Sequence, residues 1–195
     1  MARPDTVIPD KPESPYPIVQ DSVVVSGFGR GSSELGIPTA NIPINDDLNQ
    51  LETGIYYGWC QLKPCTLPDE CKTRTNGREV IYNHGKNLRN DDLKVLPMVM
   101  SIGWNPFYHL KEKAAEVHIM HKFDDFFYGA QIKFNVLGYI RPELDYTTKG
   151  EYIPVIRKIE RLLTRTEALI EDINLDIKIA LEALDRDAYQ TYKDL

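Results

Sequence analysis

The feature that most constrains the fold is a change of pattern near residue 150. Before it, short runs of β-branched and aromatic residues alternate with Gly, Pro, Asn and Asp, which is typical of strands joined by turns. These runs cover residues 23–28, 40–44, 55–62, 95–102, 115–123 and 130–140. After it, apolar residues recur every three or four positions, as on one face of a helix. The pattern predicts a mainly β fold, in which C-terminal helices cover a small antiparallel barrel.

The C-terminal part is expected to form two helices. Pro154 is tolerated only in a first turn, so the first helix is predicted to begin near Ile153. The second is predicted from about Asn174 to Leu184, with Ile177, Leu181 and Leu184 on one face. Core packing is the favoured role of the apolar stripe, and partner binding is the alternative.

The length of 195 residues suits one domain with two additions. Five prolines in residues 1–20 predict an extended arm over the surface, and a Pro-x-x-Pro spacing leaves partner docking as a minor alternative. The polar segment 63–93 is expected to be an inserted connector with a tight hairpin at Asn76-Gly77. The domain would then span 21–195, with the barrel at about 21–146 and the helices at about 153–195.

The charge balance limits the range of partners. The 23 Lys and Arg against 29 Asp and Glu give 23 − 29 = −6, which opposes binding to nucleic acid or anionic membranes. A barrel that binds single-stranded nucleic acid through its aromatics conflicts with this charge. There is no run of about 18 apolar residues and no apolar signal-peptide core. An odd number of cysteines, three, favours a reducing compartment, and we expect a cytoplasmic monomer.

Four glycines lie within the ten residues from Gly27 to Gly36. Such a segment can turn successive backbone N–H groups toward a phosphate, and Arg30 could add a charged donor. A P-loop is excluded, because Ile37-Pro38 stands where Lys-Ser/Thr is required. The Gly-x-Gly-x-x-Gly loops are excluded by Ser32. A phosphate loop and a mobile hairpin both remain open.

Two other segments carry candidate chemistry. Thr39 and Asn41 would share a face if they enter a strand, and their neutral oxygens suit Mg2+. The alternative is that their side chains form hydrogen bonds with the backbone of a turn. Glu116 and His118 share a strand face and could act as acid and base. A zinc site that adds His121 is disfavoured, because strand alternation puts His121 on the other face. The alternative without catalysis is that Glu116 is an exposed residue that forms a salt bridge.

The segment that follows the last predicted strand combines Arg141, Pro142, Glu143 and an aromatic residue. This mixture could clasp a planar polar ligand. The alternative is that Arg141 and Glu143 form an ordinary surface pair.

Together these segments resemble the eukaryotic riboflavin kinases, in a fungal-like form. The matching stretches are 27–32, 35–41, 53–59, 101–106, 116–121, 127–129 and 141–143. The resemblance implies a six-stranded antiparallel Greek-key barrel with C-terminal helices packed against it. It also implies transfer of the γ-phosphoryl group of ATP to the ribityl 5′-hydroxyl of riboflavin, which gives FMN. A non-catalytic flavin or nucleotide carrier on the same barrel is the alternative.

The resemblance also implies roles for individual residues. Glu116 is expected to engage the attacking hydroxyl, and Thr39 and Asn41 to bind Mg2+, with Zn2+ or Mn2+ as other candidate ions. The remaining residues fall into two sets: Gly27, Arg30, Gly31, Ser33, Thr39, Ile119, His121 and Tyr128 for the nucleotide, and Arg141, Glu143, Leu144 and Tyr146 for the flavin. Ser33 departs from the family, which often has a lysine there, and Leu144 lacks polar reach. The chain has no His-x-Gly-His motif, so FAD synthesis is not expected.

Overall fold

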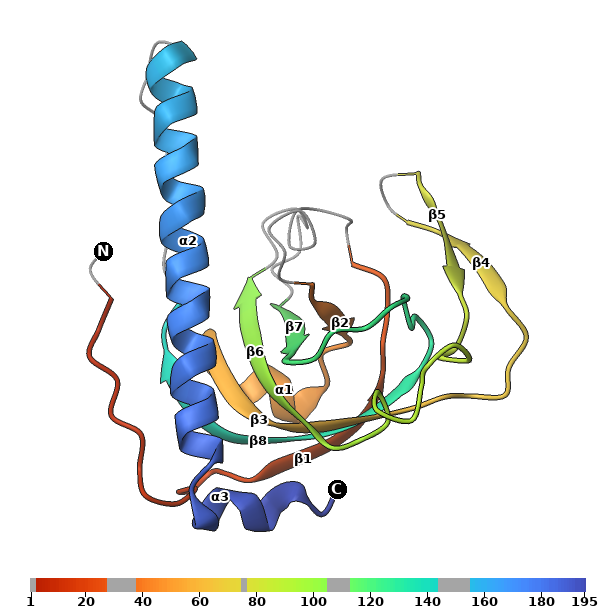
Figure 1. The fold of residues 1–195 in the computed structure, drawn as a ribbon, viewed down its shortest axis with the longest axis horizontal. Coiled ribbons are helices and arrows are strands. Elements are labelled where there is room, and N and C mark those ends of the chain that lie inside the picture. Colours follow the sequence, from red (N-terminus) through yellow and green to blue (C-terminus); the bar gives the residue numbers. More distant parts are fainter. Residues whose placement is uncertain (1–2, 28–37, 75–76, 105–112, 144–154) are drawn as a thin grey trace.

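A computed structural model describes residues 3–27, 38–74, 77–104, 113–143 and 155–195, with side chains of the long C-terminal helix from Glu167 onward. Six strands form one antiparallel sheet that curls into a half-barrel (Figure 1). Their order across the sheet is β1 (Ile18–Val23), β8 (Gln131–Arg141), β3 (Gly54–Lys63), β6 (Leu96–Trp104), β7 (Lys113–Ile119) and β2 (Ala40–Ile42). The predicted mainly β, six-stranded antiparallel fold is confirmed.

The two edge strands of the sheet, β1 and β2, are drawn together by the segment that follows β1. The backbone N–H of Val25 donates to the carbonyl oxygen of Asn41 at 2.9 Å, as an isolated antiparallel bridge. This bridge brings the start of the glycine-rich segment beside β2.

The predicted position of the first strand, 23–28, is wrong. β1 spans Ile18–Val23 and therefore begins inside the segment predicted as the N-terminal arm. Its residues alternate between partly buried and exposed, and each pairs with a residue of β8 from Val136 to Gln131. Pairing with the longest strand thus defines β1, whereas the apolar run that suggested 23–28 contributes the bridge at Val25. Phe28 lies outside the described residues.

Both faces of the half-barrel bury apolar side chains. The inner face holds the main core, which includes Tyr56, Met98, Met100, Ile102, Val117, Phe134 and Val136. The outer face of β3, β6 and β8 packs against the C-terminal helices through Tyr57, Trp59, Val99, Leu137 and Ile140. Strands covered on both faces have nearly continuous buried runs, as β3 does.

One continuous helix, α2 (Val155–Leu184), replaces the two predicted helices. The predicted break is wrong, and the physical reason is that no Gly or Pro interrupts the chain within these bounds. The predicted start near Ile153 lies outside the described residues. Ala180, Ala183 and Leu184 are buried against the outer face of the sheet, whereas Leu181 is exposed.

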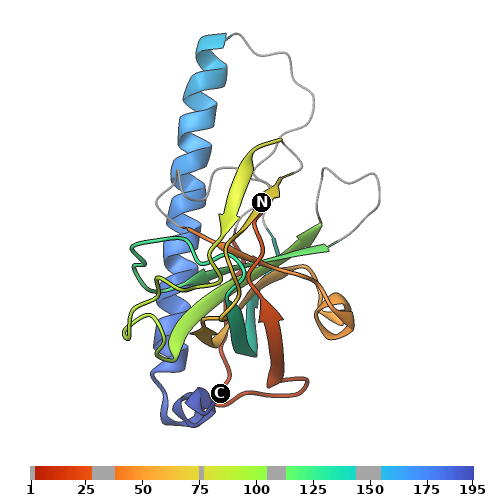
Figure 2. The same ribbon diagram turned by 90° about the vertical axis from the view of Figure 1, so that its right-hand side faces the viewer.

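Two views show how α2 stands beside the half-barrel. Its C-terminal half lies against the sheet, and its N-terminal half extends beyond one end of it (Figures 1 and 2). A short helix, α3 (Asp187–Gln190), and a single 3-10 turn (Thr191–Lys193) follow. The N-terminal arm contacts both β8 and α3: the Thr6 hydroxyl donates to the Ile140 carbonyl oxygen, and the Tyr189 hydroxyl donates to the Pro9 carbonyl oxygen.

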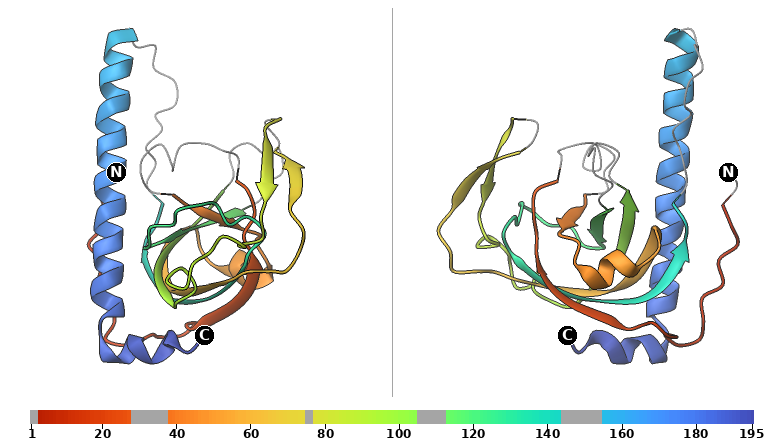
Figure 3. Two further views of the ribbon diagram at one scale, coloured as in Figure 1. Left: turned by 45° about the vertical axis from the view of Figure 1, so that its right-hand side comes forward. Right: turned by 180° about the vertical axis from the view of Figure 1, so that it is seen from behind.

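The insertion forms a separate two-stranded hairpin of β4 (Glu70–Thr73) and β5 (Glu79–Tyr82). A hairpin was predicted here; Gly77 has a positive φ of 80°, whereas Asn76 lies outside the described residues. The hairpin and the N-terminal half of α2 rise on opposite flanks of the same end of the half-barrel (Figure 3). The short helix α1 (Asp46–Gln50), capped by Asn45, was not predicted.

Candidate active site

The part of the outer sheet face that α2 leaves uncovered carries the polar side chains of β2 and β7. Ala40, Ile42, Ala115 and Val117 point into the inner core, so the alternating residues Asn41 and Glu116 point outward. Within the strand pairing, Asn41 lies opposite Glu116, and Glu116 lies opposite Ser101 of β6. A row of polar residues thus crosses three strands, and we call this row with Thr39 the polar strip.

Three predicted functional residues meet in the polar strip. The Thr39 hydroxyl donates to Oε2 of Glu116 at 3.2 Å, and Asn41 is the cross-strand neighbour of the same glutamate. Gly27 lies against Asn41 so closely that a Cβ at Gly27 would be 2.3 Å from Nδ2 of Asn41. Only glycine leaves room for this approach. The structure therefore brings a hydroxyl, an amide, a carboxylate and a glycine backbone together.

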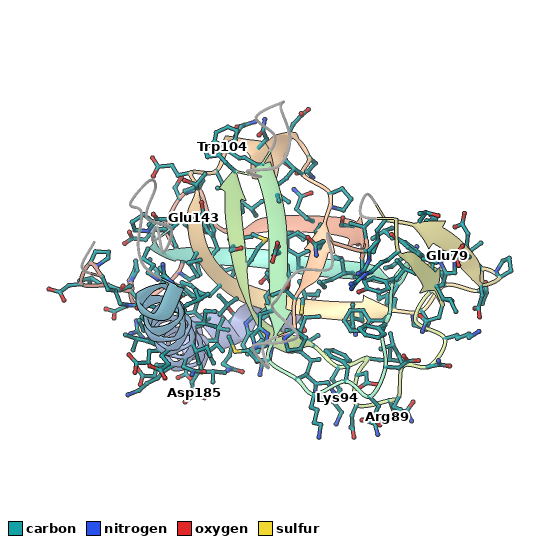
Figure 4. The ribbon with its side chains drawn as sticks, turned by 90° about the horizontal axis from the view of Figure 1, so that it is seen from above. Glu79, Arg89, Lys94, Trp104, Glu143 and Asp185 are labelled. Atoms are coloured by element: carbon teal, nitrogen blue, oxygen red, sulfur yellow. The ribbon has the colours of Figure 1, made fainter. Side chains whose placement is uncertain are left out.

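A second carboxylate, from Glu143, lies beside the polar strip. It packs on Gly103 of β6, where a Cβ would be 2.0 Å from Oε1 of Glu143. Figure 4 shows Glu143 on the side of β6 that faces α2. Burial of the carboxylate raises the pKa of Glu143, the nearby Glu116 raises it further, and Arg141 opposes the rise. Sequence reasoning missed Gly103, because its importance depends on a residue 40 positions away.

The donors in the polar strip fit a hard divalent cation. Thr39 and Asn41 offer neutral oxygens beside the carboxylate of Glu116, which is the donor chemistry that Mg2+ prefers. The zinc set does not converge: Nδ1 of His118 lies 2.9 Å from the Pro38 carbonyl oxygen, and Nε2 of His121 lies 2.7 Å from Oδ1 of Asp92. Within the described ranges, no three His, Cys, Asp or Glu side chains gather in a way that could hold a metal.

The residues expected to bind the nucleotide differ in which of their atoms are accessible to a ligand. Ile119 is only 3% exposed and belongs to the inner core, so only its backbone can meet a ligand. His121 is partly buried and contacts Asp92. Burial alone would raise the pKa of Asp92, but hydrogen bonds from the Arg89 backbone N–H and from His121 hold it below its usual value. Tyr128 stacks on the exposed Phe126 ring, with centroids 5.6 Å apart.

The residues expected at the flavin are only partly described. The guanidinium of Arg141 is buried, and its Nε and Nη2 atoms donate to the carboxylate of Asp176 on α2 at 2.6–3.2 Å. The side chain of Arg141 therefore faces the helix interface, not the polar strip. Leu144 and Tyr146, together with Arg30, Gly31 and Ser33 of the nucleotide set, lie outside the described residues.

The inserted segment reaches the same region, which the prediction of a plain connector did not include. The Tyr82 hydroxyl of β5 accepts from the backbone N–H of Ser26 at 2.9 Å and donates to the Ser26 hydroxyl at 3.2 Å. Ser26 immediately precedes Gly27. The Tyr82 ring also packs at a tilt on Tyr128, with centroids 5.8 Å apart. No local sequence signal indicates these contacts, because they join segments more than 40 residues apart.

The fold and the polar strip define an antiparallel half-barrel with an oxygen-rich site on its outer face beside a long helix. The family model for riboflavin kinase (Flavokinase) matches residues 14–158. The chain belongs to the riboflavin kinase family, and it is accordingly a kinase, a class of phosphotransferase.

Individual relatives agree with this assignment. A riboflavin kinase of Scheffersomyces stipitis is 91% identical over 195 residues, which are 100% of both chains. A riboflavin kinase of Lodderomyces elongisporus is 57% identical over 99% of this chain and 98% of its own. Among solved structures, riboflavin kinase from Trypanosoma brucei aligns with a TM-score of 0.54 at 23% identity, over 94% of this chain and 89% of that one, and supports the fold. The fungal-like resemblance is confirmed.

Proposed function

We propose that the chain is an ATP:riboflavin 5′-phosphotransferase, which transfers the γ-phosphoryl group of ATP to the ribityl 5′-hydroxyl and gives FMN and ADP. Family membership supports the substrate class. The observation that carries the proposal is the hydrogen bond from Thr39 to Glu116, with Asn41 opposite the same carboxylate. A carrier would need neither a positioned carboxylate nor the oxygen pair beside it.

Glu116 is proposed to orient the attacking hydroxyl and to accept its proton. Phosphoryl transfer passes through a loose transition state, so catalysis relies mainly on positioning and on neutralisation of charge. The hydrogen bond from Thr39 engages one carboxylate oxygen of Glu116 and leaves the other for the substrate hydroxyl. General-base assistance of this kind contributes roughly 10²- to 10⁴-fold.

Thr39 and Asn41 are proposed to hold Mg2+, with Zn2+ or Mn2+ as alternatives. When bound, the cation neutralises charge on the phosphate oxygens. Gly27 holds the Asn41 amide by close contact, and its backbone continues into the glycine-rich segment. The nucleotide set is proposed to be completed by His121, Tyr128 and the backbone of Ile119.

Glu143, which lies beside the polar strip, is proposed to face the flavin together with Leu144 and Tyr146. Arg141 is proposed to act indirectly. Its ion pair with Asp176 fixes the end of β8, from which Glu143 and the following residues start.

The decisive test is to incubate the purified protein with riboflavin and MgATP and to separate the products by chromatography. FMN and ADP should form in equal amounts in the presence of the wild-type chain, and Glu116→Gln should form them much more slowly. Tight flavin binding with no FMN, whichever nucleotide or divalent ion is supplied, would instead identify a carrier.

The cellular setting is also a proposal. The three cysteines, Cys60, Cys65 and Cys71, are free thiols, which is consistent with a reducing, cytoplasmic environment. No described helix is both long and apolar enough to cross a membrane. We propose that the chain acts as a monomer, which sedimentation at micromolar concentration would test.

A further inference from the structure

The β4–β5 hairpin carries two cations toward a pair of tyrosine rings. Nζ of Lys72 lies 4.4 Å from the ring centroid of Tyr82, and Cζ of Arg74 lies 5.6 Å from that of Tyr128. The two tyrosines contact each other. Cations at these distances are attracted to the faces of aromatic rings. Because Tyr82 is the last residue of β5, the Lys72 contact lies within the hairpin. The contacts of Arg74 and Tyr82 with Tyr128 hold the hairpin against the rest of the fold.

The tyrosine pair connects the hairpin to the polar strip. Tyr82 holds Ser26 by two hydrogen bonds, and the next residue, Gly27, lies against Asn41. A chain of direct contacts thus leads from Arg74 through Tyr128, Tyr82 and Ser26 to the oxygen ligands proposed for the cation. These contacts join the insertion to the residues around Gly27 and to the polar strip.

Arg74 has unused hydrogen-bonding capacity at this place. Its Nη2 donates to the Tyr128 hydroxyl at 3.0 Å, but its Nε is buried and has no acceptor. This is the one buried side-chain nitrogen or oxygen among the described residues that lacks a partner. Buried donors are rarely left unpaired, so this one needs an explanation. Lys72, by contrast, already has Glu70 at 3.0 Å.

The charge of the polar strip indicates what Arg74 can bind. The carboxylate of Glu116 in the polar strip, with Glu143 beside the strip, opposes a nucleotide polyphosphate unless cations lie nearby. A guanidinium presents planar paired donors that match phosphate oxygens. We propose that Arg74 binds the phosphate groups of the nucleotide substrate, which makes the inserted hairpin a part of the nucleotide site. The inference rests on the proposed function for the identity of that substrate.

The test compares phosphate-bearing and phosphate-free ligands. MgADP binding to the full chain is measured by calorimetry, and adenosine binding is measured by competition with MgADP. We expect Arg74→Gln to weaken MgADP about tenfold or more, and Arg74→Lys to weaken it less. Adenosine should bind both variants within about twofold of the wild type. A tenfold change corresponds to about 1.4 kcal/mol.

Lys72→Gln is the matched control, because it removes the same charge from the same hairpin two residues earlier. It should leave MgADP binding within about twofold of the wild type. The inference is overturned if MgADP binds Arg74→Gln as tightly as the wild type, if adenosine weakens as much as MgADP, or if Lys72→Gln causes an equal loss. The failure of the proposed function would look different: the wild-type chain would bind MgADP and make no FMN.

Discussion

The buried ion pair between Arg141 and Asp176 allows the sharpest stability prediction. The side chains are only 3% and 2% exposed, and Arg141 reaches both carboxylate oxygens of Asp176. Arg3 from the N-terminal arm adds a contact of 2.7 Å to the same carboxylate. One aspartate on α2 thus joins the end of β8 and the arm to the helix.

Asp176→Asn keeps the shape of the side chain and removes its charge. The guanidinium of Arg141 then remains buried without a counter-ion, a situation that costs about 3–5 kcal/mol. For a chain of this length each kcal/mol shifts Tm by roughly 2–4 °C, so Tm should fall by about 6–20 °C. Asp172→Asn is the matched control: Asp172 also contacts Arg3, at 3.3 Å, but is 20% exposed against 2% for Asp176, so its loss should cost less.

Urea unfolding followed by tryptophan fluorescence measures these differences, because Trp59 lies at the interface between the sheet and the C-terminal helices. An apolar double variant, Arg141→Met with Asp176→Leu, should regain most of the stability lost in Asp176→Asn, since neither charge then remains buried. The reasoning fails if Asp176→Asn costs no more than Asp172→Asn. It also fails if the double variant is less stable than Asp176→Asn.

Further predictions concern the site and its pH dependence. Glu116→Gln should retain the fold and MgADP binding but lower kcat at least tenfold, and an unchanged kcat would remove Glu116 from the mechanism. Asn41→Ala should raise the Mg2+ concentration needed for half-maximal FMN formation, which a metal titration would show. Gly27→Ala should have a similar effect, because the added methyl would displace the Asn41 amide. The pKa of Asp92 is lowered in the folded chain, so its ionised form stabilises the fold at pH values above the usual pKa of an aspartate. This contribution to stability is lost as the pH falls through the lowered pKa of Asp92. Asp92→Asn should therefore lower stability at pH 7 and flatten the acid side of the Tm–pH curve, and parallel curves would contradict this.

The outward direction of Asn41 and Glu116 could be predicted from the sequence because strand alternation is local, whereas their pairing across β2 and β7 could not. Alternation along each strand directs Asn41 and Glu116 to the face away from their buried neighbours, whatever contacts remote segments make. The position of β1 could not be predicted in this way. Residues 18–23 become a strand because β8 offers them a partner, and proline density nearby suggested an arm instead. Edge strands depend on pairing more than on their own composition.

Two other features depended on long-range contacts. Arg141 stands in a motif that suggests ligand binding, but a carboxylate 35 residues later on α2 takes its guanidinium. The insertion looked like a connector, because nothing in its composition indicates that Tyr82 contacts Ser26. In both cases the side chain types were compatible with the prediction, and tertiary packing decided which partner each one met.

The position of α2 also explains where the site begins. Val99 and Ser101 lie on the same outer face of β6, two residues apart, yet Val99 packs against the C-terminal helices and Ser101 lies across from Glu116. The boundary between the apolar and polar halves of this face therefore crosses β6 between these two residues, and Glu143 lies beside it, over Gly103. Asp176 of α2 pairs with Arg141 at the end of β8, and Glu143 follows two residues later, so we expect this ion pair to influence how closely Glu143 approaches the polar strip. A change at Asp176 should consequently affect the site through the position of Glu143, without any direct contact with substrate.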